Sequence, residues 1–172
     1  MSYKFNKNNY DADRASKPKS SLPDAGSIVL VRLISESDAG FEWCGTKETK
    51  SKAGRAMLQV HCMVEKGYRG EGCWMLDYIL LDNEYTDQRV GALLDATGHD
   101  MSKAQTFALD AKRLCGKHAY VRVKHEDYEG EPRARVAYWI VPSQYDNLGL
   151  ANIHSDDSGP IEKPNSDEKL PF

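Results

Sequence analysis

The chain has 172 residues, of which 28% are charged and 40% hydrophobic, so it is long enough for about one domain with some chain left over for arms. Its 13 glycines and 7 prolines are ordinary in number, which excludes a collagen-like chain and a wholly disordered one. The longest apolar run, residues 136–141, is far shorter than the ~20 residues that cross a bilayer, and no basic-then-apolar leader opens the chain. We therefore expect a soluble cytoplasmic protein with no membrane partner.

The formal net charge of −3 is unevenly distributed along the chain. Residues 1–24 carry five basic and three acidic side chains, whereas residues 143–172 carry two basic and six acidic ones. An acidic protein with this distribution can still bind nucleic acid, provided that its acidic residues lie in a tail and its basic residues gather on one face.

The predicted elements begin after a flexible, slightly basic arm over residues 1–24, which is rich in Lys, Asn and Ser. Alternating apolar residues then predict six strands, over residues 27–37, 41–49, 55–65, 73–81, 117–125 and 133–141. Two short helices are expected between the fourth and fifth strands. Asp87 caps the first and Gly98 follows its end, while a capping box at Ser102 starts the second and Gly116 terminates it.

This order of elements predicts a mainly β fold, an OB-fold-like small antiparallel barrel with two short helices before the last hairpin. An OB-fold has five strands, one fewer than expected here. Either the first two predicted strands share the role of one bent strand, or one of them is an added edge strand. The domain is expected over residues 25–142, and residues 143–172 are expected to form a disordered acidic tail because they are rich in Ser, Asp, Asn, Pro and Gly.

The period of two in a strand assigns side chains to opposite faces. In the fourth predicted strand it places Trp74 and Tyr78 with leucines, which predicts a core face. In the last predicted strand it places Trp139 on one face with Arg133 and Arg135, which predicts an exposed ring.

The four cysteines include no C-x-x-C pair, so their spacing gives no sign of a structural zinc site, and we expect free thiols. No G-x-x-x-x-G-K-[ST] loop for nucleotide phosphates occurs either. The sequence implies no metal and no cofactor.

Binding of single strands without reading their sequence needs cations for phosphates and exposed aromatic rings for bases. Four basic residues fall within residues 47–55, and basic side chains two positions apart on the last two strands predict a basic stripe. Turn tyrosines such as Tyr128 could add stacking surface. The candidate DNA-binding residues are Phe41, Trp43, Lys47, Lys50, Lys52, Arg55, Tyr68, Arg69, Arg122, Lys124, Arg133, Arg135 and Trp139.

The chain ends in Leu-Pro-Phe after acidic residues, a pattern with no evident folding purpose. An aromatic ring and a free carboxylate on one terminal residue suit capture by an apolar pocket with a basic side chain. This ending resembles the acidic tip of bacterial single-stranded DNA-binding proteins, from which only Lys169 departs. The matching positions, and so the expected partner-binding residues, are Asp167, Glu168, Leu170, Pro171 and Phe172.

The segment 25–142 also resembles a phage-borne family of single-stranded DNA-binding proteins. The likeness rests on Gly116-Lys117, on the pattern V-x-V-K-x-E-x-Y-x-G over residues 121–130, and on Tyr68-x-Gly70. The resemblance implies a protein that binds single-stranded DNA in a bacterial host cell. Its tip would recruit host or phage proteins of replication, recombination and repair.

Two other functions stay open at this point. An adaptor for recombination or replication enzymes would keep the tail and lack the DNA-binding face. A metal-dependent nuclease would need clustered carboxylates, for which the candidates are Asp77, Asp82, Glu84 and Glu126 with Lys124. We expect a non-enzymatic protein. The sequence leaves the oligomeric state and the choice between RNA and DNA undecided.

Overall fold

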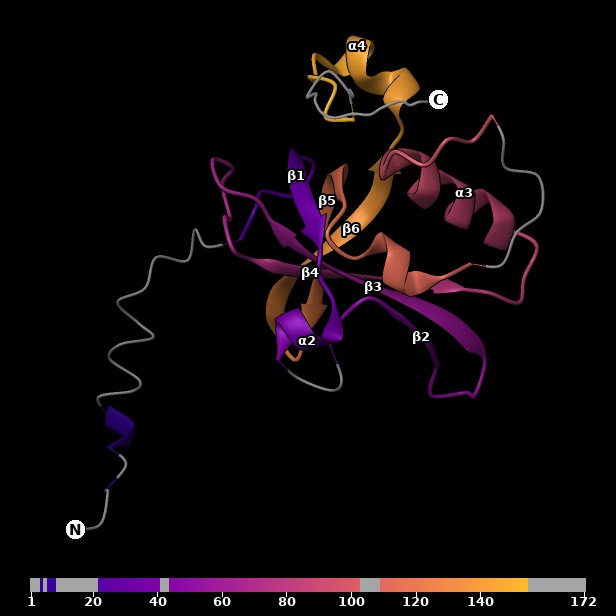
Figure 1. The fold of residues 1–172 in the computed structure, drawn as a ribbon. Coiled ribbons are helices and arrows are strands. Elements are labelled where there is room, and N and C mark those ends of the chain that lie inside the picture. Colours follow the sequence, from indigo (N-terminus) through magenta and orange to yellow (C-terminus); the bar gives the residue numbers. More distant parts are fainter. Residues whose placement is uncertain (1–3, 5, 9–21, 41–43, 103–108, 155–172) are drawn as a thin grey trace.

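The computed structural model describes residues 4, 6–8, 22–40, 44–102 and 109–154, and the fold is mainly β (Figure 1). Each of its strands overlaps a predicted one. The strands are β1 (Ile28–Leu33), β2 (Lys47–Lys50), β3 (Ala56–Val64), β4 (Trp74–Leu80), β5 (His118–Tyr128) and β6 (Glu131–Ile140). The helices are α2 (Glu36–Ala39), α3 (Thr86–Ala96) and α4 (Tyr145–Leu148), with 3-10 turns η2 (Ala111–Leu114) and η3 (Pro142–Gln144).

Five of the strands close in a ring. The order β1-β5-β6-β4-β3 returns to β1 through a pairing of β1 with β3, and α3 precedes the last two strands. This arrangement confirms the predicted mainly β, OB-like fold. The sheet is mixed, because β4 and β6 run parallel where Leu76 pairs with Arg135.

The sixth strand answers the question that the sequence left open. β2 pairs antiparallel with β3, from Lys47 opposite Gln59 to Lys50 opposite Ala56, and it stands at the end of the strand order. It is therefore an added edge strand. The β2–β3 hairpin projects from the ring in Figure 1.

The core fills the ring. Alternate residues of each ring strand point inward, and several are fully buried. They include Val31, Leu33, Leu58, Val60, Cys62, Met75, Ile79, Val121 and Val123. Burying one such side chain contributes about 1.5–3 kcal/mol, so this apolar interior is the main source of stability. α3 closes one side of the ring with Leu93, Leu94 and Ala96.

The helix ends partly follow the prediction. Gly98 lies just beyond α3 with φ +89°, as expected of a residue after a helix. Asp87 does not cap the helix but lies in its first turn, and Tyr85 occupies the N-cap. The first half of the second predicted helix falls on residues 103–108, outside the described part of the chain. Its described remainder is η2, capped by the side chain of Asp110.

The predicted face of β4 is wrong. Trp74 and Tyr78 are 39% and 40% exposed, and the inward face carries Met75, Asp77 and Ile79 instead. A carboxylate can occupy this face because it is paired there: Arg89 donates to Asp77 at 3.0 Å, and the Trp139 indole N–H donates at 2.9 Å. Because the inward face contains the charged residue Asp77, the sequence pattern predicts the opposite face of β4, with Trp74 and Tyr78, as the core face.

The predicted exposure of Trp139 is wrong as well, and a β-bulge is the reason. Val123 pairs with Val136 but Arg122 pairs with Tyr138, so Ala137 is an extra residue in β6. An extra residue shifts the alternation by one. Tyr138 is therefore exposed, and Trp139 is buried with 5% of its surface accessible.

The domain also extends beyond Pro142, where the sequence analysis ended it. Residues 142–150 form η3, α4 and a turn, and Tyr145 is buried against Tyr120 and Ile140. The Tyr120 hydroxyl donates to the Ala151 carbonyl at 3.1 Å, and His154 bonds the Ala96 carbonyl at 2.7 Å. Residues 143–154 thus belong to the folded domain, whereas residues 155–172 lie outside the described part.

At the other end of the domain, Leu22 packs against the core and Pro23 is buried. Most of the predicted arm, including residues 9–21, lies outside the described residues. In the part of the chain that the structure describes, no helix is long and apolar enough to cross a membrane.

Candidate nucleic-acid interface

The outward side chains of β3, β4, β5 and β6 form one continuous face. His61 of β3 pairs with Leu76 of β4, and Leu76 pairs with Arg135 of β6. Arg135 in turn lies opposite Lys124 of β5. Paired residues project to the same side of a sheet, so four strands contribute neighbouring side chains to this outer face.

Three arginines on this face lie over tyrosine rings. The Arg133 guanidinium is 4.4 Å from the centre of the Tyr128 ring, Arg135 is 5.5 Å from Tyr78, and Arg122 is 5.7 Å from Tyr138. Cation–π contact holds each ring and each charge together. The three tyrosines are 40–50% exposed, so their rings face solvent; Arg133 is exposed as well, whereas Arg122 and Arg135 are half-buried.

Two hollows on this face share Leu76 and Arg135 and so form one groove between β4 and the β5–β6 hairpin. The first, of about 280 Å³, lies beside His61, Trp74 and Arg133. The second, of about 190 Å³, lies beside Tyr78, Arg89, Lys124 and Glu126. We call this depression the β4–β6 groove. Its aromatic walls and basic rim are the features that single-strand binding requires.

One carboxylate moderates the positive charge of the groove. Glu126 is 3.0 Å from the Lys124 ammonium and 3.5 Å from the Arg135 guanidinium. The hydrogen bond from Lys124, with the nearby charge of Arg135, lowers the pKa of Glu126, so it is ionised at neutral pH. Glu126 thus partly neutralises Lys124 and Arg135.

His61 lines the first hollow and is fixed in one protonation state. The Gly45 backbone N–H donates to its Nδ1 at 2.9 Å. Gly45 has φ +95°, and a Cβ there would lie 2.3 Å from the Glu36 backbone nitrogen, so only glycine fits. Burial lowers the pKa of His61 to about 4, which keeps the ring neutral, and because Nδ1 accepts from the Gly45 N–H the proton is on Nε2. Among the described residues, Nε2 has no hydrogen-bond partner.

The structure brings part of the predicted basic set together. Lys124, Arg133 and Arg135 line the groove. Arg122 lies on the same face, next along β5, and donates to the Gly26 carbonyl at 2.6 Å. The four basic residues of the last hairpin thus lie on one face, as their alternation predicts.

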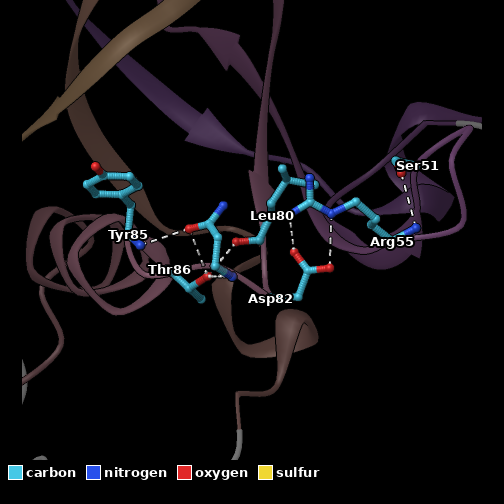
Figure 2. A network of polar contacts seen from close by, with 7 residues as sticks. Ser51, Arg55, Leu80, Asp82, Tyr85 and Thr86 are labelled. Atoms are coloured by element: carbon cyan, nitrogen blue, oxygen red, sulfur yellow. Dashed lines mark hydrogen bonds and ion pairs between the residues drawn. The ribbon is translucent and has the colours of Figure 1, made fainter.

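The cations of the β2–β3 hairpin lie apart from the groove. Arg55 donates two hydrogen bonds to Asp82, at 2.6 and 3.0 Å, and so fastens the hairpin to the β4–α3 connection (Figure 2). Lys47 is half-buried, 3.6 Å from Glu36. Lys50 and Lys52 are exposed near the hairpin tip. None of these four lines either hollow of the groove.

The remaining predicted site residues are placed elsewhere or not described. Tyr68 is half-buried and packs against the core, while Arg69 forms an ion pair with Asp24 at 3.4 Å. Trp139 is internal and cannot stack on a base. Phe41 and Trp43 lie outside the described residues, and so do the five tip residues Asp167, Glu168, Leu170, Pro171 and Phe172.

Sequence reasoning missed four residues of this face, namely His61, Trp74, Tyr78 and Tyr138. The sequence contains a signal for two of them: Trp74 and Tyr78 lie on the same face of β4, and their spacing fits an exposed face as well as a buried one. The exposure of Tyr138 results from the β-bulge, and the hydrogen-bonding state of His61 results from its contact with Gly45. Periodicity in the sequence predicts neither.

Three of the four carboxylates proposed for a nuclease are paired with different basic residues. Asp77 is paired with Arg89, Asp82 with Arg55, and Glu126 with Lys124. In the described residues, no group of three or more His, Cys, Asp or Glu side chains could hold a metal ion.

Fold and groove together define a small OB-like β domain with a basic, aromatic depression on its outer face. No protein-family model matches the sequence, and no curated protein is significantly similar to it. The function of the protein is therefore inferred from the residues of the groove.

Proposed function

We propose that this protein binds single-stranded DNA without requiring a defined sequence, and that its binding surface is the β4–β6 groove together with the Arg–Tyr pairs beside it on the same face. Single strands are bound by phosphates on cations and bases on aromatic faces. The single observation that carries the proposal is the run of three Arg–Tyr pairs, with Trp74, along one outer face of the ring.

The second half of the proposal concerns partners. The ending Leu-Pro-Phe after acidic residues supports recruitment of replication, recombination and repair proteins through the C-terminal tip. A role as an adaptor alone would need only this tip. The aromatic and basic groove favours a protein that also holds DNA.

The test is a fluorescence titration of the full-length chain with oligo-dT and with duplex DNA of equal length. Trp74 borders the groove, so single strands should quench the tryptophan emission and duplex should not. The log of the affinity should fall with log salt at a slope of about 0.7 per phosphate bound. Arg133→Ala combined with Arg135→Ala should flatten that slope by about 1.4 units.

Arg113→Ala is the matched control. Its side chain is 88% exposed, and it lies outside the groove. It should leave both affinity and slope unchanged. Equal quenching by duplex, no response to either ligand, or equal effects of the groove and control variants would refute the proposed surface.

A further inference from the structure

We infer that the hollow beside His61 is a subsite for one nucleobase that carries a carbonyl at C4 (pyrimidines) or C6 (purines), so that it favours keto bases (thymine, uracil, guanine) over the bases with an amino group there (cytosine, adenine). This inference rests on the proposed function and deepens it, because it names the chemistry that the groove reads at one position.

The size and walls of the hollow suit a single base. Pockets for small ligands span about 300–1,000 Å³, and this one, of about 280 Å³, is at their lower limit. Trp74, Leu76 and Leu22 give it apolar and aromatic walls. Arg133 and Arg135 complete the lining, and Arg133, which is exposed, is the one placed to contact a flanking phosphate.

The hollow is also lined by a residue with a buried, unpaired hydrogen-bond donor, which suits an acceptor on the edge of a base. His61 is 1% exposed, and its Nδ1 is occupied by the Gly45 N–H. The neutral ring therefore presents Nε2–H as a donor only. A buried donor left unpaired destabilises the protein, and a ligand acceptor would satisfy it.

Arg135 adds further donors. Its Nε and Nη1 are buried without a hydrogen-bond partner among the described residues; Nε lies 3.5 Å from a Glu126 carboxylate oxygen in an ion pair, which leaves Nη1 as the donor available to a ligand. Arginine can only donate. Two donor-only groups from β3 and β6 therefore line the same hollow.

Strong acceptors are missing from the described side chains around this hollow. Apart from His61 and the two arginines, the lining consists of hydrocarbon side chains, the Trp74 indole and the Cys44 thiol. An amino group on a base would meet donors and lose its own hydrogen bonds. Thymine and guanine present carbonyl acceptors where cytosine and adenine present amino groups, so the donor set selects the keto bases.

The test compares oligo-deoxyuridine with oligo-deoxycytidine, about 12 nucleotides long, by fluorescence anisotropy with the full chain at neutral pH. These bases differ at the carbonyl or amino position without the added methyl group of thymine. The wild-type protein should bind the uridine oligomer more tightly, on the order of tenfold.

Two variants separate the donor from the fold. In His61→Asn, the amide oxygen can still accept from the Gly45 N–H, but the side chain does not reach the Nε2 position. The preference should fall to within about twofold while cytidine affinity stays close to the wild-type value. In His61→Gln, an amide N–H reaches further, and part of the preference should return.

Equal affinity of the wild type for both oligomers would overturn the inference while leaving single-strand binding intact. So would a preference that persists undiminished in His61→Asn. If neither oligomer binds, the proposed function itself fails and the subsite fails with it.

Discussion

Among single residues, Trp74 is the side chain that we expect to stack on a base of the bound strand. It is 39% exposed at the groove, and its ring meets His61 edge-on, with 4.6 Å between centres. Trp74→Ala should weaken oligo-dT binding by about 1–3 kcal/mol with no change in the salt slope, because stacking is not ionic. Trp74→Phe should keep most of the affinity. Filter binding at several salt concentrations measures both quantities.

Tyr85→Ala is the control for this prediction, because Tyr85 is 59% exposed but lies at the start of α3, outside both hollows. Folding of each variant is checked by circular dichroism. A well-folded Trp74→Ala protein that binds as tightly as the Tyr85 variant would remove Trp74 from the site.

His61 also predicts a pH dependence of stability. Its pKa is about 4 in the folded chain and 6.5 ordinarily, so the unfolded chain binds a proton in the interval where the folded chain does not. Stability is thus lost as pH falls from about 6.5 to about 4, by up to about 3 kcal/mol. Urea unfolding across this range should show the loss.

His61→Asn should reduce that pH dependence, because it removes the titrating ring but keeps an acceptor for the Gly45 N–H. His154, whose pKa burial also lowers, contributes in the same direction and stays in both proteins. The difference between the two pH profiles is therefore the contribution of His61. Parallel profiles would show that protonation of His61 is not what destabilises the domain.

At the scale of elements, the sequence predicts which strands form but not always which face they bury. The apolar positions of β3 identify its core side, since Leu58, Val60 and Cys62 are all buried. β4 is apolar on both faces, so its period fits either orientation. The choice is made by partners distant in sequence, which are Arg89 and Trp139 around Asp77.

The predicted exposure of Trp139 is wrong for a related reason. The basic residues of the β5–β6 hairpin were predictable because alternation carries each pair to one face. One extra residue at Ala137 reversed the expectation for Trp139 and exposed Tyr138. Bulges and long-range ion pairs such as Arg55–Asp82 depend on three-dimensional neighbours, and no local pattern announces them.

The β5–β6 hairpin carries its own prediction through Glu126. Because this carboxylate neutralises Lys124 and Arg135, Glu126→Gln should release both cations for phosphates. Oligo-dT affinity should rise a few-fold at low salt, and the gain should shrink as salt screens the charges. Glu84→Gln, on the connection before α3, is the control and should have no such effect. A Glu126 variant that binds more weakly than wild type would show that this carboxylate supports the groove instead.

At the scale of the whole molecule, the fold separates two parts of what looked like one acidic tail. Residues 142–154 cover Tyr120 and Ile140 with Tyr145, Leu148 and other apolar side chains. Residues 155–172 carry five acidic and two basic side chains and end in Leu-Pro-Phe. We therefore expect the boundary between the folded domain and the proposed partner-binding tip to fall after residue 154.

Two truncations test this division. Removal of residues 155–172 should leave the unfolding midpoint unchanged, whereas removal of residues 142–172 should lower stability by several kcal/mol, since each large apolar side chain lost from a buried position contributes about 1.5–3 kcal/mol. The protein that lacks only residues 155–172 should bind single strands as well as the full chain, or more tightly at low salt, because a tethered acidic segment no longer competes for the groove.

The same protein should also lose replication and recombination enzymes in pull-downs, and so should Phe172→Ala alone. If the protein that lacks residues 155–172 is stable but no longer binds DNA, the tail is part of the binding site. If Phe172→Ala keeps all its partners, the likeness of this ending to an acidic tip is coincidental.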